Sequence, residues 1–313
     1  MRHEGVIPAK AGIHAFLALL VALAAGCAAR PAAPAALEGR IWDVRGERVI
    51  GKDELLGRLR AARHRMLGEA HDHPLHHELR ASLLAELVAG ADVFFEQFDR
   101  EHDEALAEAQ RRGADADALA KAGRMDRGWS WPAHRPLVGA ALAAGARVRA
   151  ANLSNADARR IAAAGALGPR DEAIARAMER ADWPPWREAA LRTDIHESHC
   201  RMLPEKQAPA MALTQRARDA AIALAISSAR GATLLIAGNG HVRRDLGVPL
   251  YLPPGEKALS VGFLETRAAE TDPRGYAYGA GGEASYDYVW FTAPHPRPDP
   301  CLAFQARPAA KGP

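Results

Sequence analysis

The sequence lacks a block of like charge and has no internal repeat. Lys and Arg number 41 against 38 Asp and Glu, so the formal net charge is only +3 over 313 residues. Because a nucleic-acid-binding protein normally concentrates basic residues in a patch, we expect no nucleic-acid partner. The remaining composition, 48% apolar and 25% charged, is ordinary for a globular chain that can bury a sizeable core.

A nucleophile motif is also missing, since no G-x-S-x-G stretch occurs. Cysteine is scarce, with three in the whole chain. Cys27 belongs to a targeting segment, which leaves Cys200 and Cys301. In a compartment that permits disulfides we expect these two to pair, and two buried free thiols are the alternative.

The amino end predicts a lipoprotein signal peptide over residues 1–27. A weakly basic start precedes the apolar run 15–25, which is too short to span a bilayer as a mature helix. The stretch LAAGC resembles a bacterial lipobox, in which Cys27 becomes lipidated and is the first mature residue. A secretory peptide cleaved nearby is the alternative. Residues 28–39 then form a Pro/Ala tether, and we expect a lipid-anchored protein at the periplasmic face or in the outer membrane.

Short apolar strands alternate with helical patterns along the body of the chain. This rhythm predicts an α/β fold, with a mainly parallel sheet and helices on both faces. We expect one α/β domain over 40–293, a helical insertion at about 155–230, and a Pro-rich tail over 294–313. The predicted strands are 65–68, 92–97, 147–152, 233–237, 259–264 and 288–292.

Polar residues recur where these strands end. The first strand is followed by GEAHD and then by a helix that starts at Pro74. Because the carboxyl ends of parallel strands form the ligand crevice of an open sheet, we expect these side chains to share one site. A polar residue inside a buried strand, such as Glu96, needs a partner or a function. The candidates at strand ends are Glu69, His71, Asp72, Glu96, Asn152, Asn239 and His241.

Helix faces supply four further candidates. His76 falls on the stripe of Leu79, Leu83 and Leu87, and its place in the first turn puts it near the crevice. On a helix expected over 187–203, His199 shares a stripe with Met202. On the next helix, from about 208 to 228, Gln215 and Asp219 share an apolar face, where a carboxylate is normally paired.

The motifs GEAHDHP, FFEQFD, VRAANLS, HCRMLP, QRARDAAIA and AGNGHVRRDLGVP make the sequence resemble the ChaN family of haem-binding uptake lipoproteins, within the wider Tiki superfamily. The resemblance covers roughly residues 40 to 300. It implies haem binding and assigns pocket positions to Glu69, His71, Glu96, Gln215, Asp219 and His241. It also implies a tyrosine iron ligand, although none of the five tyrosines falls inside a shared motif.

Three function classes remain open. In the first, the protein carries or stores haem in iron uptake, with the macrocycle packed on tryptophans such as Trp129, Trp131, Trp183 or Trp186. In the second, Glu69, His71, Glu96 and His241 hold a divalent metal that activates water for hydrolysis. The third is a non-catalytic interaction lipoprotein. We expect haem or another small ligand as the partner and the membrane as the anchor, with a homodimer left open.

Overall fold

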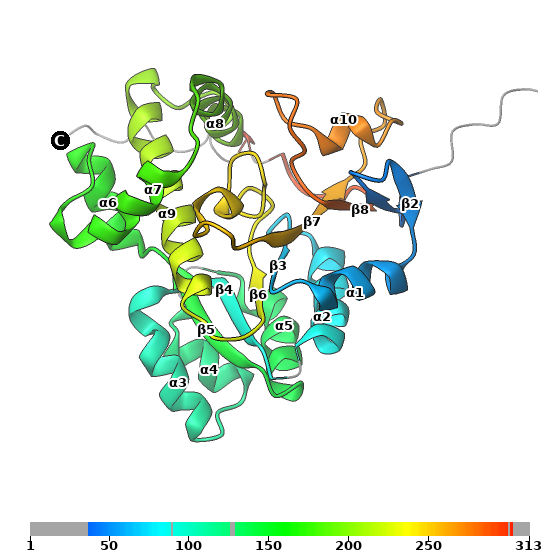
Figure 1. Ribbon diagram of the computed structural model, residues 1–313, viewed down its shortest axis with the longest axis vertical. Coiled ribbons are helices and arrows are strands. Elements are labelled where there is room, and N and C mark those ends of the chain that lie inside the picture. The colour runs from blue at the N-terminus through cyan, green and yellow to red at the C-terminus, as the bar shows by residue number, and fades with distance from the viewer. Residues whose placement is uncertain (1–36, 89, 126–128, 300, 303–313) are drawn as a thin grey trace, which may run out of the picture. The chain divides into compact units, whose positions relative to one another are not determined.

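The computed structural model describes residues 37–88, 90–125, 129–299 and 301–302. The predicted signal peptide, most of the predicted tether and the last residues of the tail lie outside this range. Within it, eight strands form one sheet, and helices pack on both of its faces (Figure 1). The predicted α/β class with a mainly parallel sheet is confirmed.

Six strands of the sheet run parallel to one another. The strands are β1 (Ile41–Asp43), β2 (Arg48–Ile50), β3 (His64–Leu67), β4 (Asp92–Asp99), β5 (Arg147–Asn152), β6 (Thr233–Ile236), β7 (Ala258–Glu265) and β8 (Tyr288–Thr292). Their order is β2-β1-β8-β7-β3-β6-β4-β5. Pairing is parallel from β8 to β5, whereas β1 pairs antiparallel with β2 and β8. The sequence did not predict β1 and β2, because three residues are too few to show an alternating pattern.

The helices separate into an early and a late group. The first group is α1 (Lys52–Ala61), α2 (Pro74–Leu87), α3 (Asp103–Arg111), α4 (Ala116–Ala122) and α5 (Trp131–Ala143). The second is α6 (Asn155–Ala164), α7 (Glu172–Arg180), α8 (Pro185–Ser198) and α9 (Ala208–Ser227), and a short α10 (Arg274–Ala277) follows later. Helices α6 to α9 all lie between β5 and β6, in the stretch where the sequence analysis expects a helical insertion. No helix among the described residues is long and apolar enough to cross a membrane.

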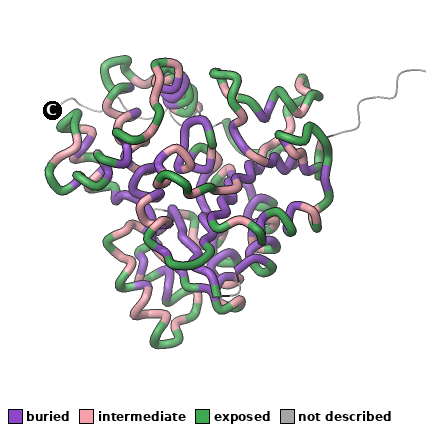
Figure 2. Tube along the Cα trace, viewed as in Figure 1, coloured by how far each residue is buried: buried purple, intermediate pink, exposed green. Residues whose placement is uncertain are grey.

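Each parallel strand buries both of its faces. In β3, Leu67 packs into a core with α1, α2 and α5, while its neighbour Met66 packs into a second core with α6, α7 and α9. Figure 2 shows the buried strands in purple, with exposed green segments on the surrounding helices. Burial on both faces explains why the strands read as nearly continuous apolar runs, and it makes the buried polar residues at their ends conspicuous.

The helix predicted over 187–203 ends earlier, at Ser198. Cys200 and Arg201 have φ angles of 57° and 56°, in the left-handed region that ends a helix. Met202 therefore lies outside the helix and is 49% exposed. The prediction that His199 and Met202 share an apolar helix face is wrong. A disulfide joins Cys200 to Cys301, with their Cα atoms 5.5 Å apart, and it ties the segment after β8 to the end of α8.

Candidate functional site

Four neighbouring strands bring the predicted site residues to one edge of the sheet. Since β3, β6, β4 and β5 are adjacent and parallel, the residues at their carboxyl ends gather there. A cavity of about 740 Å³ opens at this edge, within the usual size range of small-molecule sites. We call it the site cavity. Nine of the eleven predicted residues line it: Glu69, His71, Glu96, Asn152, His199, Gln215, Asp219, Asn239 and His241.

A larger recess, of about 900 Å³, lies away from these strand ends. It includes Lys257 and Ala258 at the amino end of β7, and none of the histidines that the structure describes lines it. The positions of the candidate residues therefore favour the site cavity as the functional site, although its volume is smaller than that of the recess.

His241 lies between two buried carboxylates in the site cavity. Its Nδ1 atom is 2.6 Å from Asp219 Oδ1, and its Nε2 atom is 3.3 Å from Glu96 Oε1. Burial by itself would lower the pKa of His241, but Glu96 and Asp219 outweigh it and raise the pKa to about 10. Burial raises the pKa of Asp219 to about 6, although His241 opposes this shift. His241 is therefore an imidazolium at neutral pH, with Nδ1 donating to Asp219 and Nε2 in an ion pair with Glu96.

The same imidazolium determines the charge of Glu96. Burial favours the protonated carboxyl, but His241 and the backbone N–H of Gly238, which donates to Oε2 at 2.7 Å, lower the pKa of Glu96 below its ordinary value. Glu96, for which the sequence analysis expected a partner or a function, therefore has two partners: the His241 ring and the Gly238 N–H.

His71 forms a second pair with Glu69. Its Nδ1 atom donates to Glu69 Oε1 at 2.9 Å, and its ring packs edge-on against Trp129, with centroids 4.9 Å apart. The side chain of His71 is 45% exposed, whereas that of Glu69 is fully buried. A Cβ atom at position 238 would lie 2.7 Å from His71 Nε2. Gly238 is therefore required for the close approach of this ring to the β6 turn.

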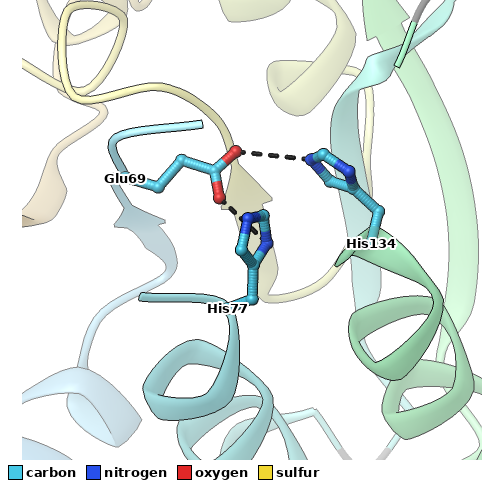
Figure 3. A group of neighbouring side chains, drawn as sticks. All are labelled: Glu69, His77 and His134. Carbon is cyan, nitrogen blue, oxygen red and sulfur yellow. Dashed lines mark ion pairs between the residues drawn. The ribbon is translucent and has the colours of Figure 1, made fainter. Parts of the chain in front are cut away.

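Buried polar side chains from α2 and α5 contact the carboxylate of Glu69 (Figure 3). His77 of α2 and His134 of α5 lie 3.3 Å and 3.5 Å from its two carboxylate oxygens. Burial lowers the pKa of both histidines to about 4, so both are neutral at pH 7. Arg80, which is fully buried, forms an ion pair with Glu69. This guanidinium supplies the positive charge that a buried carboxylate needs.

The sequence analysis missed His77, Arg80 and His134. A signal was available in α2, because His77, Arg80, Leu84 and Leu87 share the buried face of the helix. A charged residue on such a face is the criterion that identified Asp219. His134 had no comparable signal, since its helix was not among those predicted.

The four residues considered as metal ligands do not converge on one point. Among the described residues, no three of Glu69, His71, Glu96 and His241 have ligand atoms within 4.8 Å of one another. A histidine ligand must also be neutral, whereas His241 holds its proton. Glu69, His77 and His134 do come within that distance, but Arg80 already neutralises the carboxylate. The geometry therefore does not favour the metal-dependent hydrolase.

Two predicted site residues lie outside the site cavity. His76 is fully buried, accepts from the Ala70 N–H at 3.0 Å and contacts Thr292 Oγ1 at 2.9 Å. Burial, together with neighbouring His73 and His77, lowers its pKa to about 3, so His76 is a neutral core residue. Asp72 is exposed and forms an ion pair with Arg297 at 2.8 Å. The first-turn position of His76 and the strand-end position of Asp72 therefore do not bring either side chain into the site cavity.

Two further residues line the site cavity in a supporting role. Asn239 pairs with the backbone of Phe263 on β7, accepting from its N–H at 3.1 Å and donating to its carbonyl at 2.7 Å. His199 caps the end of α8 and its Nδ1 atom bonds the Ile195 carbonyl at 2.7 Å.

One wall of the site cavity is apolar. It contains Leu191 and Ile195 from α8 and Met211 from α9, which belong to one hydrophobic cluster. Leu246 and Trp129 also line the cavity. Of the four tryptophans considered for packing a macrocycle, only Trp129 lines the cavity. None of the five tyrosines lines it, so the tyrosine ligand implied by the resemblance has no counterpart there.

Comparison with known proteins gives one family match. The model of the family described as "Haem-binding uptake, Tiki superfamily, ChaN" matches residues 55–252, which is more than half of the chain. The chain belongs to this family. The matched range contains all six positions that the resemblance assigned to the ChaN pocket, and the predicted family is thereby confirmed.

The solved structure of a ChaN protein has a similar fold. A structure described as showing cofacial haem binding to ChaN of Campylobacter jejuni is 20% identical, covers 80% of this chain and 95% of its own, and has a TM-score of 0.65. The type III effector HopBA1 is 16% identical, with coverage of 78% and 93% and a TM-score of 0.43. No curated protein matches the chain.

Proposed function

We propose that this ChaN-family protein binds haem in the site cavity and serves haem or iron uptake or storage in the bacterial cell envelope. One observation carries the proposal: a chain of a haem-binding uptake family has a cavity of about 740 Å³ that combines an apolar wall with a half-exposed histidine. Apolar and aromatic walls with a few convergent polar groups are typical of cofactor sites.

The residues present fit a haem iron. Bound haem supplies an iron atom that takes an axial ligand from the protein. A histidine that ligates a metal usually donates its other ring N–H to a carboxylate, as His71 does to Glu69. Among the described residues no hydrogen-bond partner is found for His71 Nε2. We therefore assign His71 as the ligand, with Glu69 fixing its tautomer and Arg80 holding Glu69 in place.

His71→Ala is expected to lower the affinity for haem by at least about tenfold, because it removes the imidazole that the carboxylate orients. Titration of the purified protein with haem, followed at the Soret band, measures this change. His102→Ala is the control, since His102 lies in a short 3-10 turn and does not line the site cavity. A His71→Ala protein with wild-type affinity and an unchanged spectrum would remove His71 as the ligand.

We further propose that Cys27 carries a lipid and anchors the protein in the envelope. The support is the order of a weakly basic start, a short apolar run and the LAAGC stretch. Mass spectrometry of the protein from the membrane fraction should find a lipidated Cys27 as the first residue. An unmodified Cys27, or a mature start at another position, would refute the anchor.

A further inference from the structure

Arg218 of α9 lines the site cavity, and in the part of the chain that the structure describes its hydrogen-bond acceptors are all uncharged. Its Nη1 atom donates to Asn152 Oδ1 at 2.9 Å and to the Leu153 carbonyl at 2.8 Å, and its Nη2 atom donates to Asn155 Oδ1 at 2.9 Å. All three acceptors are uncharged. Among the described residues, no carboxylate oxygen lies within 4.0 Å of its guanidinium nitrogens.

Other arginines of this protein hold a carboxylate with the edge of the guanidinium that carries Nε and Nη2. Nε and Nη2 of Arg147 bind Asp92 at 2.6 Å and 3.0 Å. The second arginine of the site cavity, Arg243, binds Asp245 in this way at 2.8 Å and 2.6 Å, and it also pairs with Asp194. In Arg218, Nε and one hydrogen of Nη2 have no acceptor among the described residues. The pair of parallel N–H groups that fits a carboxylate is therefore not occupied by one.

The surroundings of Arg218 favour an anion from a ligand. Glu96, Asp99 and Asp219 also line the site cavity and act on Arg218 through space, but among the described residues none of these carboxylates lies within ion-pair distance of its guanidinium. The asparagines hold the guanidinium in place without neutralising it. Because a partly buried cation is stabilised by an opposite charge, a carboxylate that enters the cavity gains more here than in water. The apolar wall of α8 and α9 accommodates the rest of an amphiphilic molecule.

We propose that Arg218 anchors a carboxylate of the ligand, so that the site cavity selects apolar molecules that carry a carboxylate. Resting on the proposed function, this assigns Arg218 to a propionate of haem. Asn152 and Asn155 act as positioning residues that orient the guanidinium.

The test compares haem with its dimethyl ester, in which both propionates are esterified. Arg218→Gln is expected to weaken haem binding by about tenfold or more, the usual value of a charged hydrogen-bonded pair, and to leave ester binding unchanged. Arg216→Gln is the control. Arg216 lies on the same helix, stacks over Trp183 at 4.1 Å and does not line the cavity, so both affinities should stay at the wild-type level. Arg218→Lys keeps the charge without the fork and should fall between wild type and Arg218→Gln.

The outcomes distinguish failure of the Arg218 carboxylate subsite from failure of haem binding itself. If Arg218→Gln loses haem and ester binding equally, or loses neither, the carboxylate subsite is refuted while haem binding stands. If the wild type binds neither molecule, the proposed function fails. The subsite is then tested with the apolar anion 8-anilinonaphthalene-1-sulfonate, whose affinity must fall in Arg218→Gln and remain unchanged in Arg216→Gln. An equal affinity in both variants overturns it.

Discussion

His241→Ala is expected to lower the free energy of unfolding by about 3–5 kcal/mol, the usual penalty for removing one partner of a buried ion pair. The substitution leaves Glu96 and Asp219 buried near each other with no imidazolium between them. Urea denaturation at pH 7 measures the loss. His196→Ala on α8 is the control, since that half-buried ring makes no side-chain hydrogen bond or ion pair with the described residues, and its stability should stay close to wild type.

The pH dependence of the same variant provides a second readout. His241 has a folded-state pKa of about 10, above its ordinary value of 6.5. Its proton therefore stabilises the folded state fully below pH 6.5, and this contribution is lost as the pH rises through about 10. Denaturation at pH 7 and pH 9.5 should show a decline for wild type that His241→Ala lacks. Parallel declines in both proteins would show that His241 does not hold its proton between the carboxylates.

The Cys200→Ser/Cys301→Ser protein is expected to lose up to ~4.7 kcal/mol of stability, because the bridge closes a loop of about 100 residues and restricts the unfolded chain. The two cysteines are separated by 101 positions. Guanidinium denaturation of the variant and of wild type, each with and without reductant, measures the effect. The variant should be insensitive to reductant and should match reduced wild type. Wild-type protein with free thiols at both positions, or a variant as stable as oxidised wild type, would contradict the prediction.

The sheet was predictable because buried parallel strands are short apolar runs, and β3 to β8 all have this pattern. The carboxyl-edge rule then brought Glu69, Glu96 and His241 into one cavity without knowledge of the strand order. The order itself was not predictable. It depends on β6 returning between β3 and β4 after four helices, and no local pattern specifies that return.

The local geometry of the site was less predictable than its position. His76 and Asp72 belong to the same segment as His71, yet the backbone directs one side chain into the core and the other towards Arg297. Closeness in the sequence does not determine these side-chain directions, because Asp72 precedes α2 whereas His76 lies in its first turn. Arg218 was also missed, because no sequence pattern distinguishes it from the other arginines, and only the structure shows that it is bonded to Asn152 and Asn155.

Titration of the purified wild-type protein with haem tests the central claim most directly. If haem binds in the site cavity, the Soret band must shift and saturate at a defined stoichiometry, and His71→Ala must weaken that binding. The account would be contradicted by a protein that shows no saturable Soret change and instead hydrolyses an ester or a peptide only when a divalent metal is added.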